Sequence, residues 1–440
     1  MLTAFKRLGL FLVGFSLPIQ GYSFLDFSFG MTPFKVATAI LLVIGLLEFV
    51  VFRRKFPHDR KRWWMVAFLA SSAIACVTGL GSGAPLPSVL IATSTHLSVI
   101  VYYFLIGYVV RSRRDLMLIL WALLIGGGVT AAPAVLGLEQ GSDGMQGARY
   151  MGLAGQENLF GFDMAMCLPV GMGLFFSTRS FLGRGLALGF SISCVLGLFL
   201  SLSRSAFVSL AVMGAFWMVR STRAESFKYI VPVLAIVVGL AIVAPRSVME
   251  RVDTMVNPER RADDGSIQSR FLQARLALRA VASSPIVGVG VLGFIPWSQR
   301  QPGGFGNEHD VHNAYLGLVA EQGLPGPFLF VALLLLTWGD YSRCIREVRA
   351  RRRQRDFSLA EVAHCATFLQ LALLGGMVGG MFGMAQWSKT LWLVLALSPV
   401  LVSLCRARIL ELEPPHEDQV GFKSLDFRSA GSPSGSVWHA

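Results

Sequence analysis

Arg204 is the first side chain in this sequence that could do chemistry, because its charge stands between two apolar runs, in Ser201-Leu-Ser-Arg-Ser205. A charge at the end of an apolar segment is costly and usually faces the protein interior or a water-filled cavity. An arginine in such a place can also extend toward lipid headgroups. The planar guanidinium suits a phosphate or diphosphate. We therefore predict that Arg204 binds such a group.

A second group of arginines lies on a predicted amphipathic helix that begins near Ser269. Arg270, Arg275 and Arg279 are expected to share one side of this helix. Its apolar positions include Leu272, Leu276 and Leu278. A solvated cationic surface would explain the pattern equally well, so a substrate-facing Arg270 and a supporting Arg275 remain two of the possibilities.

The same segment continues into a glycine-rich run. Ser283-Ser-Pro285 ends the helix, and Gly288-Val-Gly290-Val-Leu-Gly293 follows. This run matches G-x-G-x-x-G, but a dinucleotide site needs a preceding strand and a following helix in a βαβ unit. An apolar segment follows soon instead. We therefore expect the glycines to allow close packing of the backbone against other helices.

His309-Asp-Val-His312-Asn313 lies just before an apolar segment. With Glu308 and Asp310, the two histidines could bind a metal, and Glu308-x-Asp310 resembles the acidic pair that binds a divalent ion in some lipid-linked glycosyltransferases. Alternatively, His312 is a general base whose neighbours tune its pKa. Asn313 or Asp310 could also simply cap the following helix.

Composition places these residues in a membrane protein. Of the 440 residues, 54% are apolar and 15% are charged, whereas a soluble domain carries about 25% charged residues. Disordered chains, disulfide-rich secreted domains and coiled coils are excluded by the same values. The six cysteines form no C-x-x-C pair or metal spacing, so we interpret them as apolar packing residues.

About 20 apolar residues are needed for a helix to cross a bilayer, and twelve segments qualify. They are approximately 8–28, 32–52, 63–80, 89–110, 116–137, 158–177, 185–202, 206–219, 229–244, 314–338, 362–383 and 389–405. Only Ser203-Arg204-Ser205 separates the seventh segment from the eighth, and one continuous helix would exceed the bilayer thickness. A tight hairpin is therefore predicted there.

The distribution of lysine and arginine among the loops predicts how these segments are oriented in the membrane. Every second loop is basic, so that 25 of the 39 lysines and arginines fall on one side. The positive-inside rule makes that side cytoplasmic and places both termini there. It also explains the net charge of +13 without nucleic acid. The loops 138–157 and 245–313 would then face away from the cytoplasm, and we expect the signal-like N-terminus to be retained as a span.

Several catalytic motifs are absent from the sequence, and their absence excludes some classes of mechanism. The sequence holds no P-loop, no G-x-S-x-G and no H-E-x-x-H, which argues against ATP-driven transport, serine hydrolysis and zincin proteolysis. Carboxylates within the apolar segments are few, namely Glu48, Asp163 and Glu321. A proton-coupled transporter usually needs more of them.

Taken together, the motifs resemble the O-antigen ligase and polymerase family. They are Ser203-Arg204 closing a span, the Arg270 helix running into Pro285-x-x-Gly-x-Gly290, and His312-Asn313-x-Tyr-Leu followed by Glu321-x-Gly-Leu-x-Gly326. Arg149-Tyr-Met-Gly152 ahead of Asn158 is similar to an upstream element of the family. The resemblance covers residues 149–330.

This resemblance implies a multi-pass enzyme of the bacterial inner membrane with its active site on the periplasmic side. The donor would be a glycan on undecaprenyl pyrophosphate, and the reaction would invert the anomeric centre without a metal or other cofactor. The family's arginines match Arg204 and Arg270, and its essential histidine matches His312. Arg149, Arg275, Asn313 and Asp310 are possible supporting residues.

The acceptor remains open in this prediction. A ligase passes the glycan to lipid A–core, whereas a polymerase passes it to another lipid-linked repeat. Residues 383–392 contain no acidic residue to match one that some ligases carry in their late spans. A transporter or flippase of lipid-linked glycans is the alternative, since it too would need arginines for a diphosphate. Such a protein should line several spans with polar groups through the bilayer midplane.

The predicted fold is all-α: a polytopic membrane protein with about 12 transmembrane helices and a long periplasmic loop that contains amphipathic helices. Its regions are 1–137 (N-terminal transmembrane helices), 138–340 (catalytic core, including the loop 245–313), 341–361 (basic cytoplasmic loop), 362–405 (C-terminal transmembrane helices) and 406–440 (cytoplasmic, disordered tail).

Overall fold

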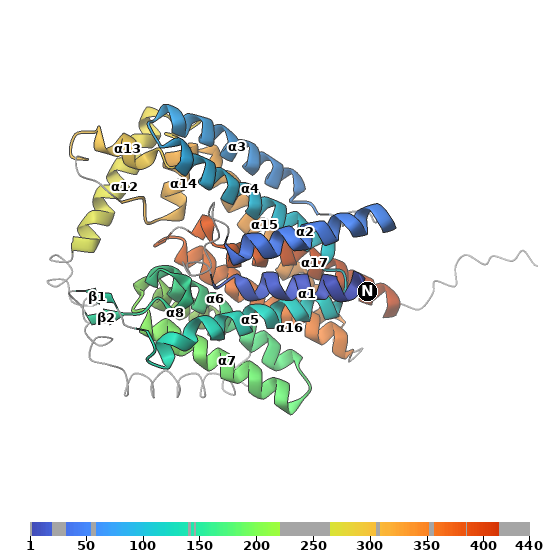
Figure 1. Ribbon diagram of the computed structural model, residues 1–440. Coiled ribbons are helices and arrows are strands. Elements are labelled where there is room, and N and C mark those ends of the chain that lie inside the picture. Colours follow the sequence, from blue (N-terminus) through green and yellow to red (C-terminus); the bar gives the residue numbers. More distant parts are fainter. Residues whose placement is uncertain are drawn as a thin grey trace, which may run out of the picture.

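The computed structural model describes residues 2–19, 32–53, 59–139, 142–144, 147–220, 265–304, 309–351, 356–383 and 385–412. Within these ranges the chain is an all-α bundle with one short β-hairpin (Figure 1), which confirms the predicted fold class. The predicted span 229–244, residues 245–264 of the long loop, Glu308 and the tail after Leu412 lie outside the described residues.

The described elements are α1 (Leu2–Ser16), α2 (Pro33–Phe52), α3 (Arg62–Gly81), α4 (Leu86–Val109), α5 (Arg113–Val135), β1 (Ser142–Gly144), β2 (Gly147–Arg149), η2 (Gly152–Ala154), α6 (Glu157–Ser177), α7 (Phe181–Leu200), α8 (Arg204–Arg220), α12 (Gly265–Ser283), α13 (Phe294–Gln299), α14 (Ala314–Gln322), α15 (Pro325–Ala350), α16 (Phe357–Gly379), η4 (Ala385–Trp387) and α17 (Lys389–Leu412). In this part of the chain, nine helices are long and apolar enough to cross a membrane: α2 to α7 and α15 to α17.

Two of the remaining predicted spans are shorter helices. The described part of the first is α1, which has 15 residues, and the eighth is α8, which has 17. The predicted hairpin between α7 and α8 is confirmed, because the chain turns at residues 201–203. Leu202 has φ +48 in this turn, a left-handed conformation that costs a non-glycine residue about 1–2 kcal/mol. The turn is buried, so packing holds this conformation.

The predicted single span 314–338 is wrong, because two helices replace it. The first, α14, ends at Gln322, and Gly323 follows with φ +67 and its backbone against that of Ile286. The second, α15, begins at Pro325, whose fixed φ suits a first helical turn. It runs on to Ala350, so helix occupies the first part of the predicted loop 341–361. The glycine and the proline together explain the break.

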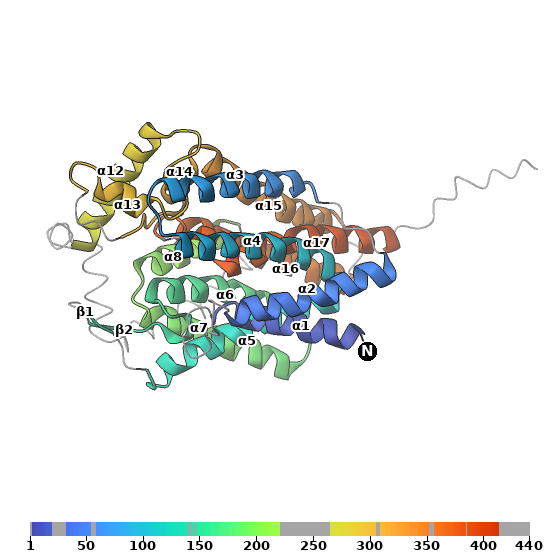
Figure 2. The ribbon, with the colours of Figure 1, turned by 45° about the horizontal axis from the view of Figure 1, so that its top comes forward.

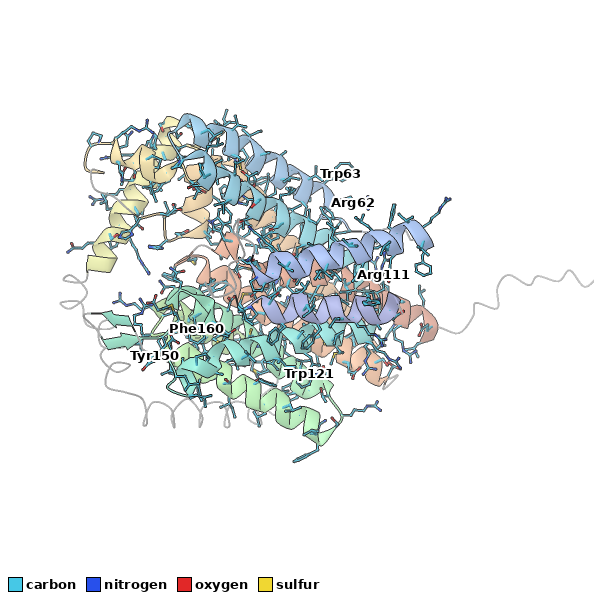
Figure 3. The ribbon with its side chains drawn as sticks, in the orientation of Figure 1. Arg62, Trp63, Arg111, Trp121, Tyr150 and Phe160 are labelled. Carbon is cyan, nitrogen blue, oxygen red and sulfur yellow. The ribbon has the colours of Figure 1, made fainter. Side chains whose placement is uncertain are left out.

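Ion pairs join the loops at one end of the bundle, which we call the basic end. Lys6 at the start of α1 binds Asp115 in α5 at 2.9 Å, and Arg408 of α17 binds Asp356 before α16 at 2.7 Å. Arg62 and Arg111 lie toward this end, where the N-terminus also lies (Figure 3). The loops predicted to share one membrane face therefore meet in space.

A buried polar network closes the basic end. The Lys61 ammonium is fully buried and lies 2.6 Å from an Asp340 carboxylate oxygen and 2.5 Å from the Ser398 hydroxyl. It ties the start of α3 to α15 and α17. Arg60 also reaches Asp340, at 3.0 Å. Removing one partner of a buried ion pair leaves an uncompensated charge, which is strongly destabilising.

Lys61→Met is therefore expected to lower the free energy of unfolding by about 3 kcal/mol, the lower end of the range for broken buried pairs, because Arg60 stays beside Asp340. Thermal unfolding of the purified protein in detergent measures the effect. Arg62→Gln, an exposed change at the next residue, is the control and should shift stability by less than about 0.5 kcal/mol. Equal melting temperatures for the two variants would contradict the role of Lys61.

The centre of the bundle is formed by α6, α16 and α17, whose buried faces belong to the main core. Small residues let these helices approach closely, as expected in membrane bundles. Gly171 of α6 lies against Ser191 of α7, and Gly379 of α16 lies against Phe162 of α6. All six cysteines are buried and none is in a disulfide, which confirms their interpretation as packing residues.

A compact unit of short helices lies at the other end of the bundle. It consists of residues 265–304 and 309–322, with α12, α13 and α14, and we call it the cap unit. It has a small core of its own: Leu276, Ala277, Ala280, Val289, Phe294, Val311 and Ala320. Both views place it at the end opposite to the N-terminus, on the side of α3 (Figures 1 and 2).

Candidate functional site

The glycine run attaches the cap unit to the bundle, as predicted. Val289 and Gly290 donate their backbone N–H groups to the carbonyls of Ala320 and Glu321 in α14, at 2.8 and 2.9 Å. Val291 donates to Ala75 in α3 at 2.8 Å. Gly290 has φ +89, and a Cβ there would clash with the backbone of Gly79. Only glycine allows this contact, and the run is a packing element.

Gly290→Ala is expected to destabilise the protein by about 2–3 kcal/mol, because overpacking and a strained φ act together. The melting temperature and the yield of folded protein are the measurements. Gly81→Ala is the matched control, because a Cβ at Gly81 meets nothing within 4 Å. If both variants behave like the wild type, the proposed attachment is wrong.

The arginines of α12 do not share a side, so that expectation is wrong. At 100° per residue, Arg275 lies about 140° from Arg270 and Arg279 about 180° from it. Arg270 is half-buried, beside the face that holds the buried Ala277. Arg275 and Arg279 are exposed, and Arg279 donates to the Pro302 carbonyl at 2.7 Å. The structure therefore separates Arg270 from the other two.

The positive charge of Arg270 acts on the His312 imidazole. The imidazole is half-buried, and its pKa is lowered, first by burial and then by the positive charge of Arg270 and by His309. The rings of His309 and His312 are 6.5 Å apart. A lowered pKa keeps His312 neutral near pH 7, and a neutral imidazole can accept a proton. The roles of His312 as a general base and of Arg270 as a diphosphate ligand stay predictions.

Asn313 holds His312 at the entrance of α14. Its side-chain oxygen accepts the backbone N–H groups of Tyr315 and Leu316, both at 3.0 Å, which is the N-cap arrangement. The capping role weighed for Asn313 is thus confirmed. Asp310 accepts the N–H of Val311 at 2.7 Å, and burial raises the pKa of its carboxyl. These residues shape the turn that carries His312.

Arg204 belongs to a second polar group, with Arg149. Arg149 donates to the Asn158 side-chain oxygen at 3.1 Å and to the Ser201 carbonyl at 3.4 Å. The Ser203 hydroxyl reaches the same Asn158 oxygen at 3.4 Å. Arg204 is half-buried and is the first residue of α8. A helix N-terminus attracts anions, so the position reinforces the positive charge of the guanidinium.

Both polar groups are fastened to the end of α16. From the cap unit, Ala314 donates its N–H to the Gly380 carbonyl at 2.7 Å, and the Tyr315 hydroxyl donates to the Met377 carbonyl at 2.9 Å. From α8, the Ser209 hydroxyl donates to the Gly375 carbonyl at 3.1 Å. Arg204 lies roughly 7.5 Å further along the α8 axis. The elements that carry His312 and Arg204 are thus both hydrogen-bonded to the C-terminal part of α16 or to the residue that follows it.

Two further residues of this region had no assigned role in the sequence analysis. Asn158 joins Arg149 to the serine turn, and only the tertiary structure reveals that link. Lys389, the first residue of α17, is buried, and its ammonium lies 4.9 Å from the centre of the Phe34 ring. A lysine within an apolar segment is itself a signal of function. It lies in the segment 383–392 that lacks an acidic residue.

The metal site weighed as an alternative for His309 and His312 is only partly covered by the described residues. No group of three His, Cys, Asp or Glu in the described ranges is arranged to hold a metal ion. Glu308, which was weighed as a metal ligand together with His309, His312 and Asp310, lies outside those ranges.

Residues 189–331 match the O-antigen ligase family. The match begins in α7 and ends in α15, so it contains Arg204, Arg270 and His312, whereas Arg149 lies outside it. No curated protein matches the chain.

The family match supports the resemblance inferred from the motifs. In this segment the chain is similar to the O-antigen ligase family, which supports a role in surface polysaccharide synthesis. In the described residues this match accompanies nine helices long and apolar enough to cross a membrane. Of the three candidate residues in the matched segment, Arg204 starts α8, His312 lies just before α14, and Arg270 lies in the second turn of α12.

Proposed function

We propose that the protein transfers a glycan from undecaprenyl pyrophosphate to an acceptor hydroxyl at the periplasmic face of a bacterial inner membrane. The bond between the anomeric carbon and the pyrophosphate oxygen breaks, and a bond from the acceptor oxygen to that carbon forms. The reaction inverts the anomeric centre and needs neither ATP nor a metal, because the donor is already activated.

In this proposal the arginines hold the leaving group. Negative charge develops on the pyrophosphate as the glycosidic bond breaks. Arg204, at the N-terminus of α8, and Arg270, in the cap unit, would bind its oxygens. Donors fixed in place toward developing charge commonly contribute several kcal/mol in a site from which water is excluded. Arg149 would support Arg204 through Asn158 and the turn before α8.

His312 would accept the proton of the acceptor hydroxyl. The observation that carries this role is the half-buried imidazole beside Arg270, with its pKa below the ordinary value. A base must be neutral at working pH, and both burial and the neighbouring cation favour neutrality. The same cation would draw the donor pyrophosphate to the base, so that the acceptor oxygen meets the anomeric carbon there.

A reconstituted transfer assay tests the proposal. The purified full-length protein is mixed with a lipid-linked glycan and with either lipid A–core or a second lipid-linked repeat. Glycan on lipid A–core identifies a ligase, and lengthened lipid-linked glycan identifies a polymerase. Movement of the donor across a vesicle membrane with no transfer to either acceptor would identify the transporter or flippase instead and would refute the enzyme.

A deletion strain gives an independent readout in the cell. Single repeats accumulate when a polymerase is missing, whereas long chains stay on the carrier lipid when a ligase is missing. Unchanged surface polysaccharide in the deletion strain would contradict a role of this protein in its synthesis.

A further inference from the structure

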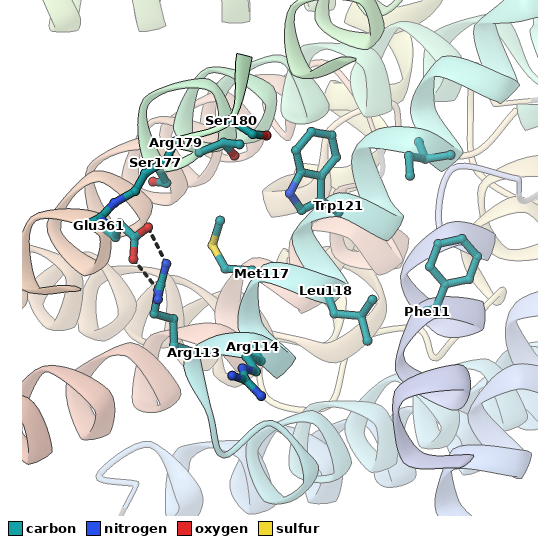
Figure 4. Close-up of a pocket in the computed structure, with 12 residues that line it drawn as sticks. Phe11, Arg113, Arg114, Met117, Leu118, Trp121, Ser177, Arg179, Ser180 and Glu361 are labelled. Atoms are coloured by element: carbon teal, nitrogen blue, oxygen red, sulfur yellow. Dashed lines mark hydrogen bonds and ion pairs between the residues drawn. The ribbon is translucent and has the colours of Figure 1, made fainter. Parts of the chain in front are cut away.

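A second candidate binding site lies at the basic end, far along the bundle from the cap unit. It is a cavity of about 670 Å³ over the first three turns of α5, and its lining comes from α1, α5, the turn between α6 and α7, and α16. Figure 4 shows the lining side chains. None of them takes part in the reaction proposed above.

The mouth of the cavity is positively charged. Arg113 and Arg114 of α5 and Arg179 of the α6–α7 turn line it, together with one acid, Glu361 of α16. The Arg113 guanidinium lies 2.5 Å from a Glu361 oxygen, so this pair is neutral overall. The lining therefore carries two positive charges in excess. The hydroxyls of Thr178 and Ser180 lie at the same mouth.

The body of the cavity is apolar. Met117, Leu118, Trp121 and Ile125 line it along successive turns of α5, and Phe11 of α1 lies on one flank. From Arg113 to Ile125 the helix rises roughly 18 Å, which is close to half of a hydrocarbon core about 30 Å thick. The cavity thus runs from a charged rim to about the depth of one leaflet. Trp121 contributes an amphipathic ring of the kind found near membrane interfaces.

We propose that this cavity binds one anionic glycerophospholipid from the leaflet at the basic end of the bundle. Its phosphate would lie between Arg114 and Arg179, and an acyl chain would follow Met117, Trp121 and Ile125. Charge and shape both favour this occupant, because a soluble anion would leave the apolar wall uncovered and a neutral lipid would leave the rim without a counter-charge. Basic pockets between membrane helices bind anionic headgroups in the same way.

Lipid retention measures the proposal directly. The full-length protein is placed in nanodiscs of phosphatidylethanolamine and phosphatidylglycerol at three to one, extracted into detergent, and examined by native mass spectrometry. The wild type should retain one phosphatidylglycerol in preference to phosphatidylethanolamine. Each arginine near an anionic headgroup is worth about 1 kcal/mol, so Arg114→Gln should weaken retention about fivefold and Arg114→Gln with Arg179→Gln about 30-fold.

Two more variants separate the site from general surface charge. Arg62→Gln removes an exposed arginine at the same end but outside the cavity, and it should retain lipid like the wild type. Met117→Trp fills the cavity without changing its charge and should lose the lipid. Equal retention of both lipids by the wild type, loss of lipid in Arg62→Gln, or full retention in Met117→Trp or the double variant would each overturn the proposal. Arg113 is left intact, because it pairs with the buried Glu361.

Discussion

His312→Ala is expected to reduce glycan transfer by about 10²–10⁴-fold, the usual contribution of a general base, while donor binding and folding stay close to wild type. The side chain is half-buried at the entrance of α14 and makes no capping bond, since Asn313 caps that helix. Single-turnover transfer with saturating donor is the measurement. Wild-type rates from the His312→Ala protein would remove the proposed base.

The pH dependence of the wild type provides a second check on His312. Its pKa lies below the ordinary value of 6.5, because of burial, Arg270 and His309 in that order. A neutral base works above its pKa, so activity should fall as pH drops through this lowered value, and the acid limb of the profile should lie below pH 6.5. An acid limb at or above pH 6.5 would contradict a lowered pKa in the working enzyme.

Replacing Arg204 or Arg270 should reduce glycan transfer nearly as much as replacing His312. Arg270→Gln and Arg204→Gln are each expected to lower transfer about 10²–10³-fold, the effect of losing one fixed donor toward a developing negative charge. Both side chains are half-buried, and the cap unit and α8, which carry them, are each hydrogen-bonded to α16 or to the residue that follows it. Transfer rates and binding of the undecaprenyl pyrophosphate product would be measured for each variant.

The Arg204 and Arg270 variants are expected to differ in the pH dependence of transfer. After burial, Arg270 is the next cause of the lowered pKa of His312, whereas Arg204 is not among the causes. Arg270→Gln should therefore move the acid limb upward, toward pH 6.5, and Arg204→Gln should leave it in place.

Arg275→Gln is the matched control on the same helix. It removes an identical charge five residues along α12, from an exposed position on another face. We expect a transfer rate within about twofold of wild type and an unchanged profile. A loss equal to that of Arg270→Gln would show that the separation of these faces is wrong.

Much of the architecture follows from apolar length alone, since eight of the nine membrane-length helices in the described residues coincide with predicted segments, and α15 overlaps the second half of the predicted span 314–338. The turn before Arg204 was also predictable, because one continuous helix would exceed the bilayer thickness. The packing role of Gly290 was predictable because its run lacks the βαβ context of a dinucleotide site. The break at Gly323 was missed because the apolar run continues through it, although Gly323 followed by Pro325 was a readable signal.

The spatial arrangement of the candidate site residues was harder to predict than their identity. The wrong grouping of Arg270 with Arg275 and Arg279 came from neglecting the helical angle between them. The link from Arg149 to Ser203 through Asn158 joins β2, α6 and the turn before α8. Contacts between residues so far apart in sequence depend on packing, and neither spacing nor composition encodes them in a readable form.

The attachment of the cap unit has a mechanical consequence. The cap unit bears Arg270 and His312 and is bonded to α3 through Val291, whereas Arg204 starts a helix that packs with α6 and α16. A pyrophosphate touching both arginines would therefore act as a brace between the cap unit and α8, in addition to the bonds that each makes to the end of α16. Release of the pyrophosphate carrier after transfer would remove that brace. The protein without carrier should therefore unfold at a lower temperature than the protein with the loaded carrier bound.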